Sequence, residues 1–149
     1  MFSQDRTALR RVYIDAWRKA QAGEPLQPLE QQLTEIIQRH PEYHGLLDAG
    51  VDALDRDWLP EQGESNPFLH MSLHSAVLEQ VTADRPPGIR ALYQRMIQHC
   101  LGDVHEAEHR LMDCLAEIMW QAQRDGREPD PAALLRCINS RCGGNRFGS

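Results

Sequence analysis

The sequence predicts an all-α fold, a single-domain helical bundle of about six to seven helices with short connections. Apolar residues recur every three to four positions along most of the chain, as on one face of a helix. No segment shows the alternation of a β-strand or an Asn-Gly hairpin turn. The 149 residues suit one core, so we expect a helical domain over residues 1–142 and a flexible C-terminal tail over 143–149.

The N-terminal half predicts two longer helices and a short one. An apolar stripe over residues 9–20 marks the first helix. Pro28 can open the second, whose stripe runs on in phase to His40. Pro41 breaks the helix there, because an interior proline removes a backbone hydrogen bond and clashes with the preceding turn. A short helical piece follows, and the charged stretch 55–65 has the composition of a loop.

The C-terminal half predicts four more helices, and three of them have a start signal. Asn66 is a good N-cap and is followed by proline, which is preferred at the first helical position. Asp103 and Asp130 can cap the last two helices, and Gly126 can end the longer one. The expected helices cover residues 67–83, a segment from 89 to the glycine at 102, 104–125 and 131–141.

The overall composition restricts the class of partner. The formal net charge is −6 and no run of five lysines or arginines occurs, so no basic stripe is present to bind nucleic acid. No stretch approaches the roughly 20 apolar residues of a membrane span, and the N-terminus lacks the apolar core of a secretory signal. We therefore expect a cytoplasmic protein without nucleic-acid or membrane partners. A homodimer or an unidentified protein partner stays open.

The four cysteines show no Cys-x-x-Cys pair and no zinc-ribbon spacing. Cys100 and Cys114 lie in helical apolar patterns, which is typical of buried thiols that pack as small hydrophobic side chains. Cys137 and Cys142 stand near the glycine-rich tail. They could form a redox pair or chelate a metal, although packing is the more common role.

The most informative pattern is the spacing of the histidines. Six of the seven form three pairs separated by four residues, whereas random placement would give about 0.3 such pairs. Residues four apart are neighbours on one helix face, where two imidazoles can bind one metal ion. The pairs are His40 and His44 in HPEYH, His70 and His74 in HMSLH, and His105 and His109 in HEAEH.

Helical phase selects among these pairs. His70 and His74 fall in the middle of their apolar stripe and are expected to face the core. His105 and His109 lie at the edge of the next stripe, and Glu108 falls inside it. A core-facing carboxylate is rare unless it is paired, protonated or bound to a metal. The predicted metal ligands are therefore His70, His74, His105, Glu108 and His109, with iron, manganese or zinc as the ion.

His40 and His44 are weaker candidate ligands, because Pro41 interrupts the helix between them. Tyr43 could hydrogen-bond to a site there, or be a partly buried structural tyrosine. Glu106 and His109 match the Glu-x-x-His pattern of di-iron bundles, but no second copy of that motif occurs. The residue types fit a hemerythrin-like site better, although its ligand spacing is not reproduced in full.

The pattern leaves the function open between classes. A redox-active metal would favour oxidation by oxygen or peroxide, or oxygen sensing, whereas zinc would favour hydrolysis. A non-enzymatic interaction module would use the buried histidines structurally, and a pH-responsive protein would use their titration. Whether the protein is an enzyme is not decided. The sequence contains no Gly-x-Gly-x-x-Gly, no Walker loop and no Gly-x-Ser-x-Gly, so nothing points to a nucleotide or an organic cofactor.

Three long motifs resemble a known family. They are HPEYH, then ESNPFLHMSLH followed by EQ, and HEAEH with WQAQR downstream. Together they are similar to the bacterial family catalogued as domain of unknown function 1841, over about residues 1–130. The resemblance implies a small bacterial cytosolic protein. It implies no activity and assigns no catalytic residue.

Overall fold

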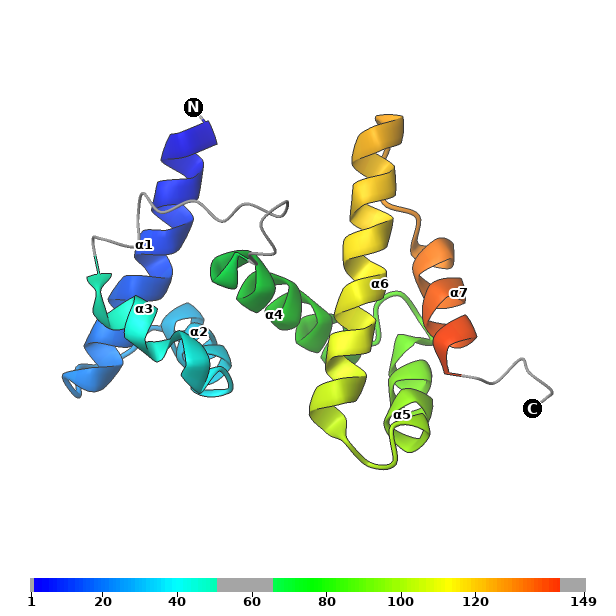
Figure 1. Ribbon diagram of the computed structural model, residues 1–149, viewed down its shortest axis with the longest axis horizontal. Coiled ribbons are helices and arrows are strands. Elements are labelled where there is room, and N and C mark those ends of the chain that lie inside the picture. The colour runs from blue at the N-terminus through cyan, green and yellow to red at the C-terminus, as the bar shows by residue number, and fades with distance from the viewer. Residues whose placement is uncertain (1, 51–65, 143–149) are drawn as a thin grey trace. The chain divides into compact units, whose positions relative to one another are not determined.

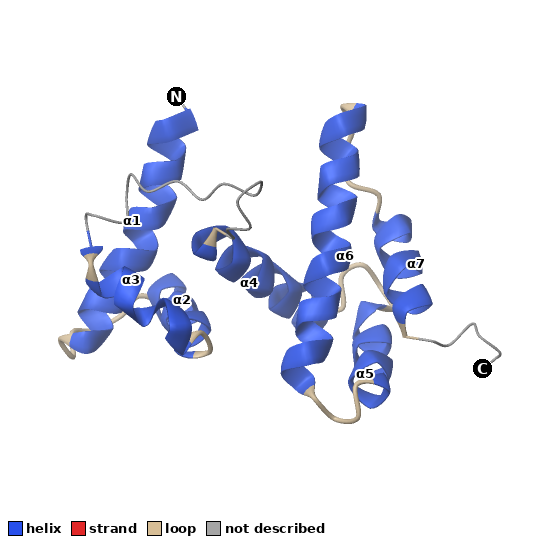
Figure 2. Ribbon diagram, viewed as in Figure 1, coloured by secondary structure: helices blue, strands red, loops and turns tan. Residues whose placement is uncertain are grey.

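A computed structural model describes residues 2–50 and 66–142, and every regular element in these ranges is helical (Figures 1 and 2). The all-α helical fold is thus confirmed. The backbone clusters into two compact units, Met1–Ser75 and Ala76–Ser149, and helix α4 contributes residues to both. The elements are α1 (Phe2–Gln21), α2 (Pro28–Gln38), the 3₁₀ helix η1 (Pro41–Tyr43), α3 (His44–Asp48), α4 (Pro67–Ala83), α5 (Ile89–His99), α6 (Val104–Asp125) and α7 (Pro131–Arg141).

The expected helices agree closely with these bounds, because their ends carry strong local signals. Pro41 ends the second helix as predicted, and the chain continues as η1. The Asn66 side chain accepts hydrogen bonds from the backbone N–H groups of Phe68 at 2.9 Å and Leu69 at 3.3 Å, and so caps α4. The predicted loop 55–65 and the predicted tail 143–149 lie outside the described residues. The single-domain boundary at residue 142 stays a prediction.

In the first unit, α1 packs against α2 and α3. Tyr13 and Trp17 of α1 are buried, and the Trp17 indole N–H donates to the Asp48 carboxylate at 2.7 Å. The predicted stripe of α1 is partly wrong. Leu9 is 46% exposed, whereas Arg10 is buried, with its guanidinium 5.3 Å from the centre of the Phe68 ring. A cation over an aromatic face can be buried where an aliphatic residue was expected.

A partly exposed ion pair joins α2 to the end of α1. Glu30 accepts from the Lys19 ammonium at 2.7 Å and from the backbone N–H of Gln27 at 2.8 Å. These two contacts, with the lysine contact the larger, lower the pKa of the Glu30 carboxyl below its ordinary value. The glutamate therefore both caps α2 and fixes the end of α1 beside it.

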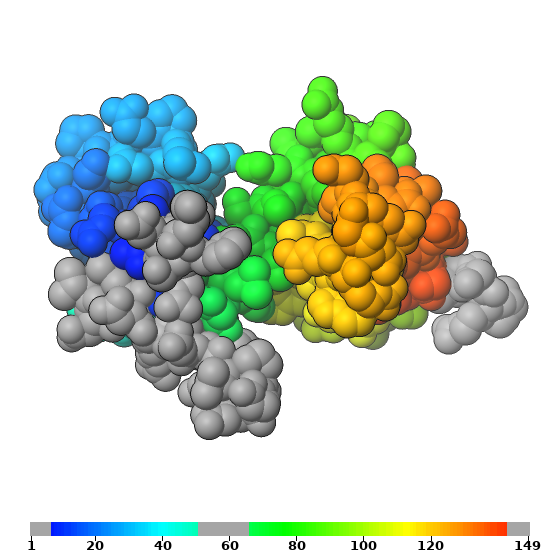
Figure 3. Space-filling view, turned by 90° about the horizontal axis from the view of Figure 1, so that it is seen from above, coloured from blue at the N-terminus to red at the C-terminus, as the bar shows by residue number. Residues whose placement is uncertain are grey.

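In the second unit, α5, α6 and α7 pack against one another. The N-caps are those predicted: Asp103 accepts from the N–H of Glu106 and Asp130 from that of Ala132, each at 3.0 Å. The C-terminal turns of α6 face solvent in the view of Figure 3. There Trp120 is 59% exposed, and the Arg124 guanidinium lies 4.9 Å from its ring centre.

The cysteines differ from the expectation. Cys114 is buried as predicted, but it forms a disulfide with Cys137 that links α6 to α7, with the Cα atoms 5.8 Å apart. Cys137 thus pairs with Cys114, while Cys142 and Cys100 carry free thiols. Helix spacing along one segment cannot reveal a partner on another helix. Because disulfides persist mainly in oxidising compartments, the cysteines no longer favour the cytoplasm, and that location stays a prediction.

None of the helices described is both long enough and apolar enough to cross a bilayer.

Candidate metal centre

Three histidines of the first unit come together from two separate segments of the chain. The apolar stripe of α2 runs through Ile36 and Ile37 to His40, which is fully buried just before η1. The N-terminal half of α4 supplies His70 and, one turn later, His74. This part of α4 is anchored to α1, since the Tyr13 ring packs edge-on against Phe68 and the Tyr13 hydroxyl hydrogen-bonds to Ser72 at 3.0 Å.

The three imidazoles face one another closely. The ring centre of His40 lies 4.9 Å from that of His70 and 5.1 Å from that of His74, and the two α4 rings are 6.5 Å apart. One ring nitrogen, either Nδ1 or Nε2, can be taken from each histidine so that all three nitrogens lie within 4.8 Å of one another. His40 and His74 are completely buried, and His70 is half-buried. The predicted core-facing direction of the α4 pair is therefore confirmed for His74.

Hydrogen bonding fixes the tautomer of His40. Its Nδ1 lies 2.8 Å from the carbonyl oxygen of Ile36, and because a carbonyl only accepts, Nδ1 carries the proton. The lone pair of the neutral ring then lies on Nε2, which points at Nδ1 of His74 at 3.3 Å. Histidines that bind metals commonly donate their other N–H to a backbone carbonyl, which fixes the ring orientation. His40 already has this arrangement.

The distance between the two facing nitrogens is compatible with two uses. Two nitrogens each about 2.05 Å from a zinc ion, at a tetrahedral angle, lie about 3.3 Å apart. Without an ion, Nδ1–H of His74 can donate to Nε2 of His40 over the same 3.3 Å, which is long for a hydrogen bond. The pair is thus spaced for a shared ion and also makes an internal contact when no ion is bound.

Tyr43 forms one wall of this cluster. Its ring is stacked on His40 with the planes 9° apart and the centres 5.5 Å apart, and it lies edge-on to His70 at 5.9 Å. Burial raises the pKa of the Tyr43 phenol, and the negative charge of Glu42 raises it further. Tyr43 therefore stays a neutral phenol beside the imidazoles. The sequence pointed to it only through its place inside HPEYH.

His44 lies elsewhere. Its ring packs against Trp17 with the centres 4.3 Å apart, and its Nε2–H donates to the carbonyl of Ile37 at 3.0 Å. This ring braces α3 against α1 and α2, so the structure gives His40 and His44 different environments. The proline that interrupts the motif is the physical reason, because it takes the two residues off a common helix face.

The other predicted ligands, on α6, belong to the second unit. His105 is exposed and His109 half-buried, with their ring centres 4.1 Å apart. Glu108 is 2% exposed, which confirms its predicted core position, and it accepts a hydrogen bond from the Tyr93 hydroxyl at 2.7 Å. That tyrosine is a partner which the sequence pattern did not reveal. The role of these α6 residues as ligands stays a prediction.

The donor set of the cluster in the first unit indicates which ions it could hold. Neutral imidazole nitrogens suit zinc, copper, iron and nickel, whereas magnesium and calcium prefer oxygen ligands. The sequence makes His40 a weaker candidate ligand because of Pro41. In the structure, however, the His40 ring contacts both α4 histidines. Its phase with the α2 stripe was the signal that placed it in the core.

Comparison with known proteins identifies the family and nothing more specific. A family model described as a domain of unknown function (DUF1841) matches residues 5–140, which is nearly the whole chain. No curated protein and no solved structure matches the chain. The family description assigns neither an activity nor a ligand, so the chemistry of the histidine cluster has to be argued from its own geometry. The resemblance carried by the three histidine motifs is confirmed, and the chain belongs to the DUF1841 family.

Proposed function

We propose that this protein binds a transition-metal ion through His40, His70 and His74. The observation that carries the proposal is the convergence of three imidazoles, two of them completely buried, with one nitrogen of each within 4.8 Å of the others. A single ion would bind one nitrogen of each of the three rings, which are ligands of the kind that transition metals accept. The fixed Nδ1–H of His40 supports this reading, because it orients the ligand atom before the ion arrives.

Zinc and iron are the ions that the site favours most among those predicted. Both accept imidazole nitrogens, whereas manganese prefers oxygen ligands. Three protein ligands leave at least one coordination position for water or another ligand. A bound zinc ion would supply hydrolytic chemistry by lowering the pKa of that water, and a bound iron ion would supply redox chemistry. In either case this chain's residues bind the ion, and Tyr43 excludes water from one side.

A second candidate function follows from the same hydrogen bonds. Nδ1–H of His74 donates to His40, and Nδ1–H of His40 donates to Ile36, so the chain of donors is coherent without an ion. In that case the histidines are structural, which is what the alternative of a non-enzymatic interaction module requires. The metal-binding proposal predicts that metal affinity falls when a histidine is replaced by a residue of similar size. The structural alternative predicts no such fall.

The deciding experiment uses glutamine substitutions in the full chain. We expect His40→Gln and His74→Gln each to weaken zinc binding at least tenfold, measured by competition with a chromophoric chelator. His99→Gln is the matched control, because His99 is exposed at the end of α5 and should leave the affinity unchanged. Circular dichroism checks that each variant is folded. Zinc binding that survives both substitutions would assign the histidines a structural role.

The same assay tests the ligands that the sequence alone nominates on α6. His109→Gln and Glu108→Gln should weaken binding if these residues complete the coordination shell. His105→Gln tests the third predicted ligand on α6, whose side chain is exposed. Unchanged affinity in all three would confine the site to the first unit and remove the α6 residues from the predicted shell.

A further inference from the structure

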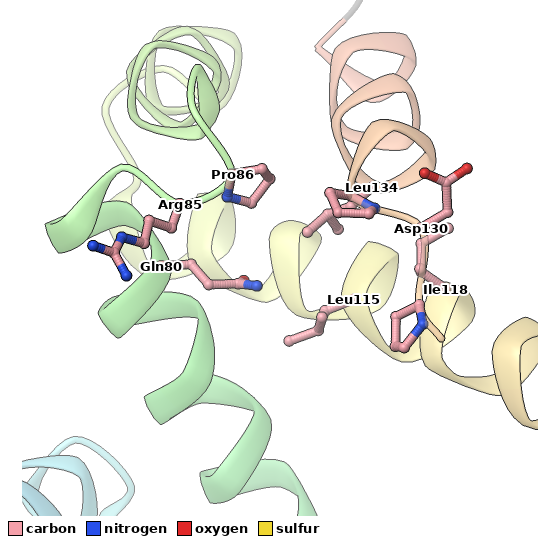
Figure 4. Close-up of a pocket in the computed structure, with 9 residues that line it drawn as sticks. Gln80, Arg85, Pro86, Leu115, Ile118, Asp130 and Leu134 are labelled. Carbon is pink, nitrogen blue, oxygen red and sulfur yellow. The ribbon is translucent and has the colours of Figure 1, made fainter. Parts of the chain in front are cut away.

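The second unit contains a pocket with no histidine among its lining residues. It has a volume of about 330 Å³ and lies between the last turn of α4, the middle of α6 and the start of α7 (Figure 4). Small-molecule sites begin at about 300 Å³ and are mostly apolar with few polar groups. At about 30 Å³ for each water volume, the pocket holds a ligand of roughly ten non-hydrogen atoms.

The walls of this pocket are apolar and poor in hydrogen-bond donors. Leu115 and Ile118 of α6 and Leu134 of α7 line it. Prolines at positions 86, 129 and 131 supply much of the remaining wall, and proline has no backbone N–H. Water held against such walls cannot make its usual hydrogen bonds. An apolar molecule that displaces this water is therefore favoured.

The charged lining residues are turned outward. In Figure 4 the Arg85 guanidinium points away from the cavity, and so does the carboxylate of Asp130. That carboxylate is already used, since it accepts from the backbone N–H of Ala132 at 3.0 Å and lies 3.8 Å from the Arg136 guanidinium. A charged ligand group inside the pocket would lose water without gaining a partner of opposite charge.

One polar side chain does enter. The Gln80 amide points from α4 toward Leu115 in Figure 4. Its Oε1 is buried and has no hydrogen-bond partner among the described residues. A buried acceptor without a partner is costly, and the last torsion of a glutamine is broad enough to turn the amide toward a ligand. The amide can both donate to and accept from one group of that ligand.

We infer that this pocket binds a small neutral molecule, an apolar body of about ten non-hydrogen atoms bearing one hydroxyl or amide group that hydrogen-bonds to Gln80. The apolar body fills the space between α6 and α7, and Gln80 selects the polar group. This inference rests on the second unit alone. It is therefore independent of the metal site proposed for the histidines.

The test titrates the ¹⁵N- and methyl-labelled full chain with three probes of nearly equal size, which are 2-phenylethanol, phenylacetate and ethylbenzene. We expect saturable shifts with 2-phenylethanol, and nuclear Overhauser contacts from its ring to the methyl groups of Leu115 and Leu134. Phenylacetate should bind at least tenfold more weakly, because its carboxylate finds no partner. No saturation by 2-phenylethanol at about 10 mM, or contacts that map to other residues, would overturn the inference.

The role of Gln80 is tested by the ratio of two dissociation constants, that of ethylbenzene to that of 2-phenylethanol. Gln80→Leu should lower this ratio by about twofold to tenfold, the range for one neutral hydrogen bond. Gln94→Leu is the matched control, because it makes the same chemical change at an exposed position of α5 that does not line the pocket. An equal ratio in wild type and Gln80→Leu would refute selection by the amide, and tighter binding of phenylacetate would refute the neutral ligand.

Discussion

The N-cap of α4 offers a sharp test of how local sequence positions the histidine cluster. Asn66 accepts from the N–H groups of Phe68 and Leu69, and His70 follows in the next position of the helix. Replacing a capping asparagine by alanine typically costs about 1 kcal/mol, with a range of about 0.5–2. Because two N–H groups lose their acceptor, we expect Asn66→Ala to lie at or above the middle of that range.

The assay is urea unfolding of the full chain, monitored by circular dichroism. The slope of the unfolding free energy against urea concentration should be the same in all variants. Asn66→Ala should lower the free energy of unfolding by about 1–2 kcal/mol, which is a shift of about 2–8 °C in the melting temperature. Asn66→Ser keeps a capping oxygen and should lose at most a few tenths of a kcal/mol. Equal losses in the two variants, or no loss in either, would refute the assignment of the cap.

The same substitution should reach the proposed metal site. A first turn of α4 that frays must be reordered before His70 can bind, so the cost of the lost cap appears in the metal affinity. The expected cost of about 1–2 kcal/mol corresponds to roughly a fivefold to thirtyfold weaker affinity. Asn66→Ala should therefore weaken zinc binding by at most about thirtyfold. A larger loss would mean that Asn66 does more than cap the helix.

Three further predictions concern stability. Because hydrogen bonds lower the pKa of Glu30, its carboxylate stabilises the fold above about pH 4.3, and this contribution is lost as the pH falls through the lowered pKa. Glu30→Gln should accordingly lower the melting temperature at pH 7 but not at about pH 2, and an equal drop at both would contradict the ion pair. Tyr93→Phe removes a hydrogen bond to the buried Glu108 and should cost about 1.5–3 kcal/mol in urea unfolding at pH 7, so a loss under about 0.5 kcal/mol would be inconsistent with that bond. Cys114→Ser opens a loop of 23 residues and should lower the free energy of unfolding by about 3 kcal/mol, matched by reduction of the wild type; a variant as stable as the oxidised protein would show that the Cys137 disulfide does not constrain it.

The elements of this fold could be predicted because their ends carry local chemistry. The caps at Asn66, Asp103 and Asp130 each satisfy N–H groups of the next few residues, so the information lies within one turn. Proline at position 41 likewise acts on its own helix. What the local pattern missed depends on partners far along the chain. Arg10 is buried and its guanidinium lies over the ring of Phe68, which is 58 positions away.

The candidate site was predictable in part for the same reason. Spacing and phase placed His74 in the core, since both are properties of one helix. The convergence of His40 with the α4 pair is tertiary, because it joins the end of α2 to a helix that begins more than 25 residues later. The disulfide and the Tyr93 contact to Glu108 are tertiary in the same sense. Periodicity within a segment cannot specify which segment it meets.

The metal content of the native protein tests the central claim most directly. Untagged full-length protein, purified without chelators, should contain close to one zinc or iron ion per chain by elemental mass spectrometry. X-ray absorption at that metal should show nitrogen ligands at about 2.0–2.1 Å and no sulfur. A protein that contains no transition metal and takes up neither ion on incubation would contradict the account and leave the three histidines as structure.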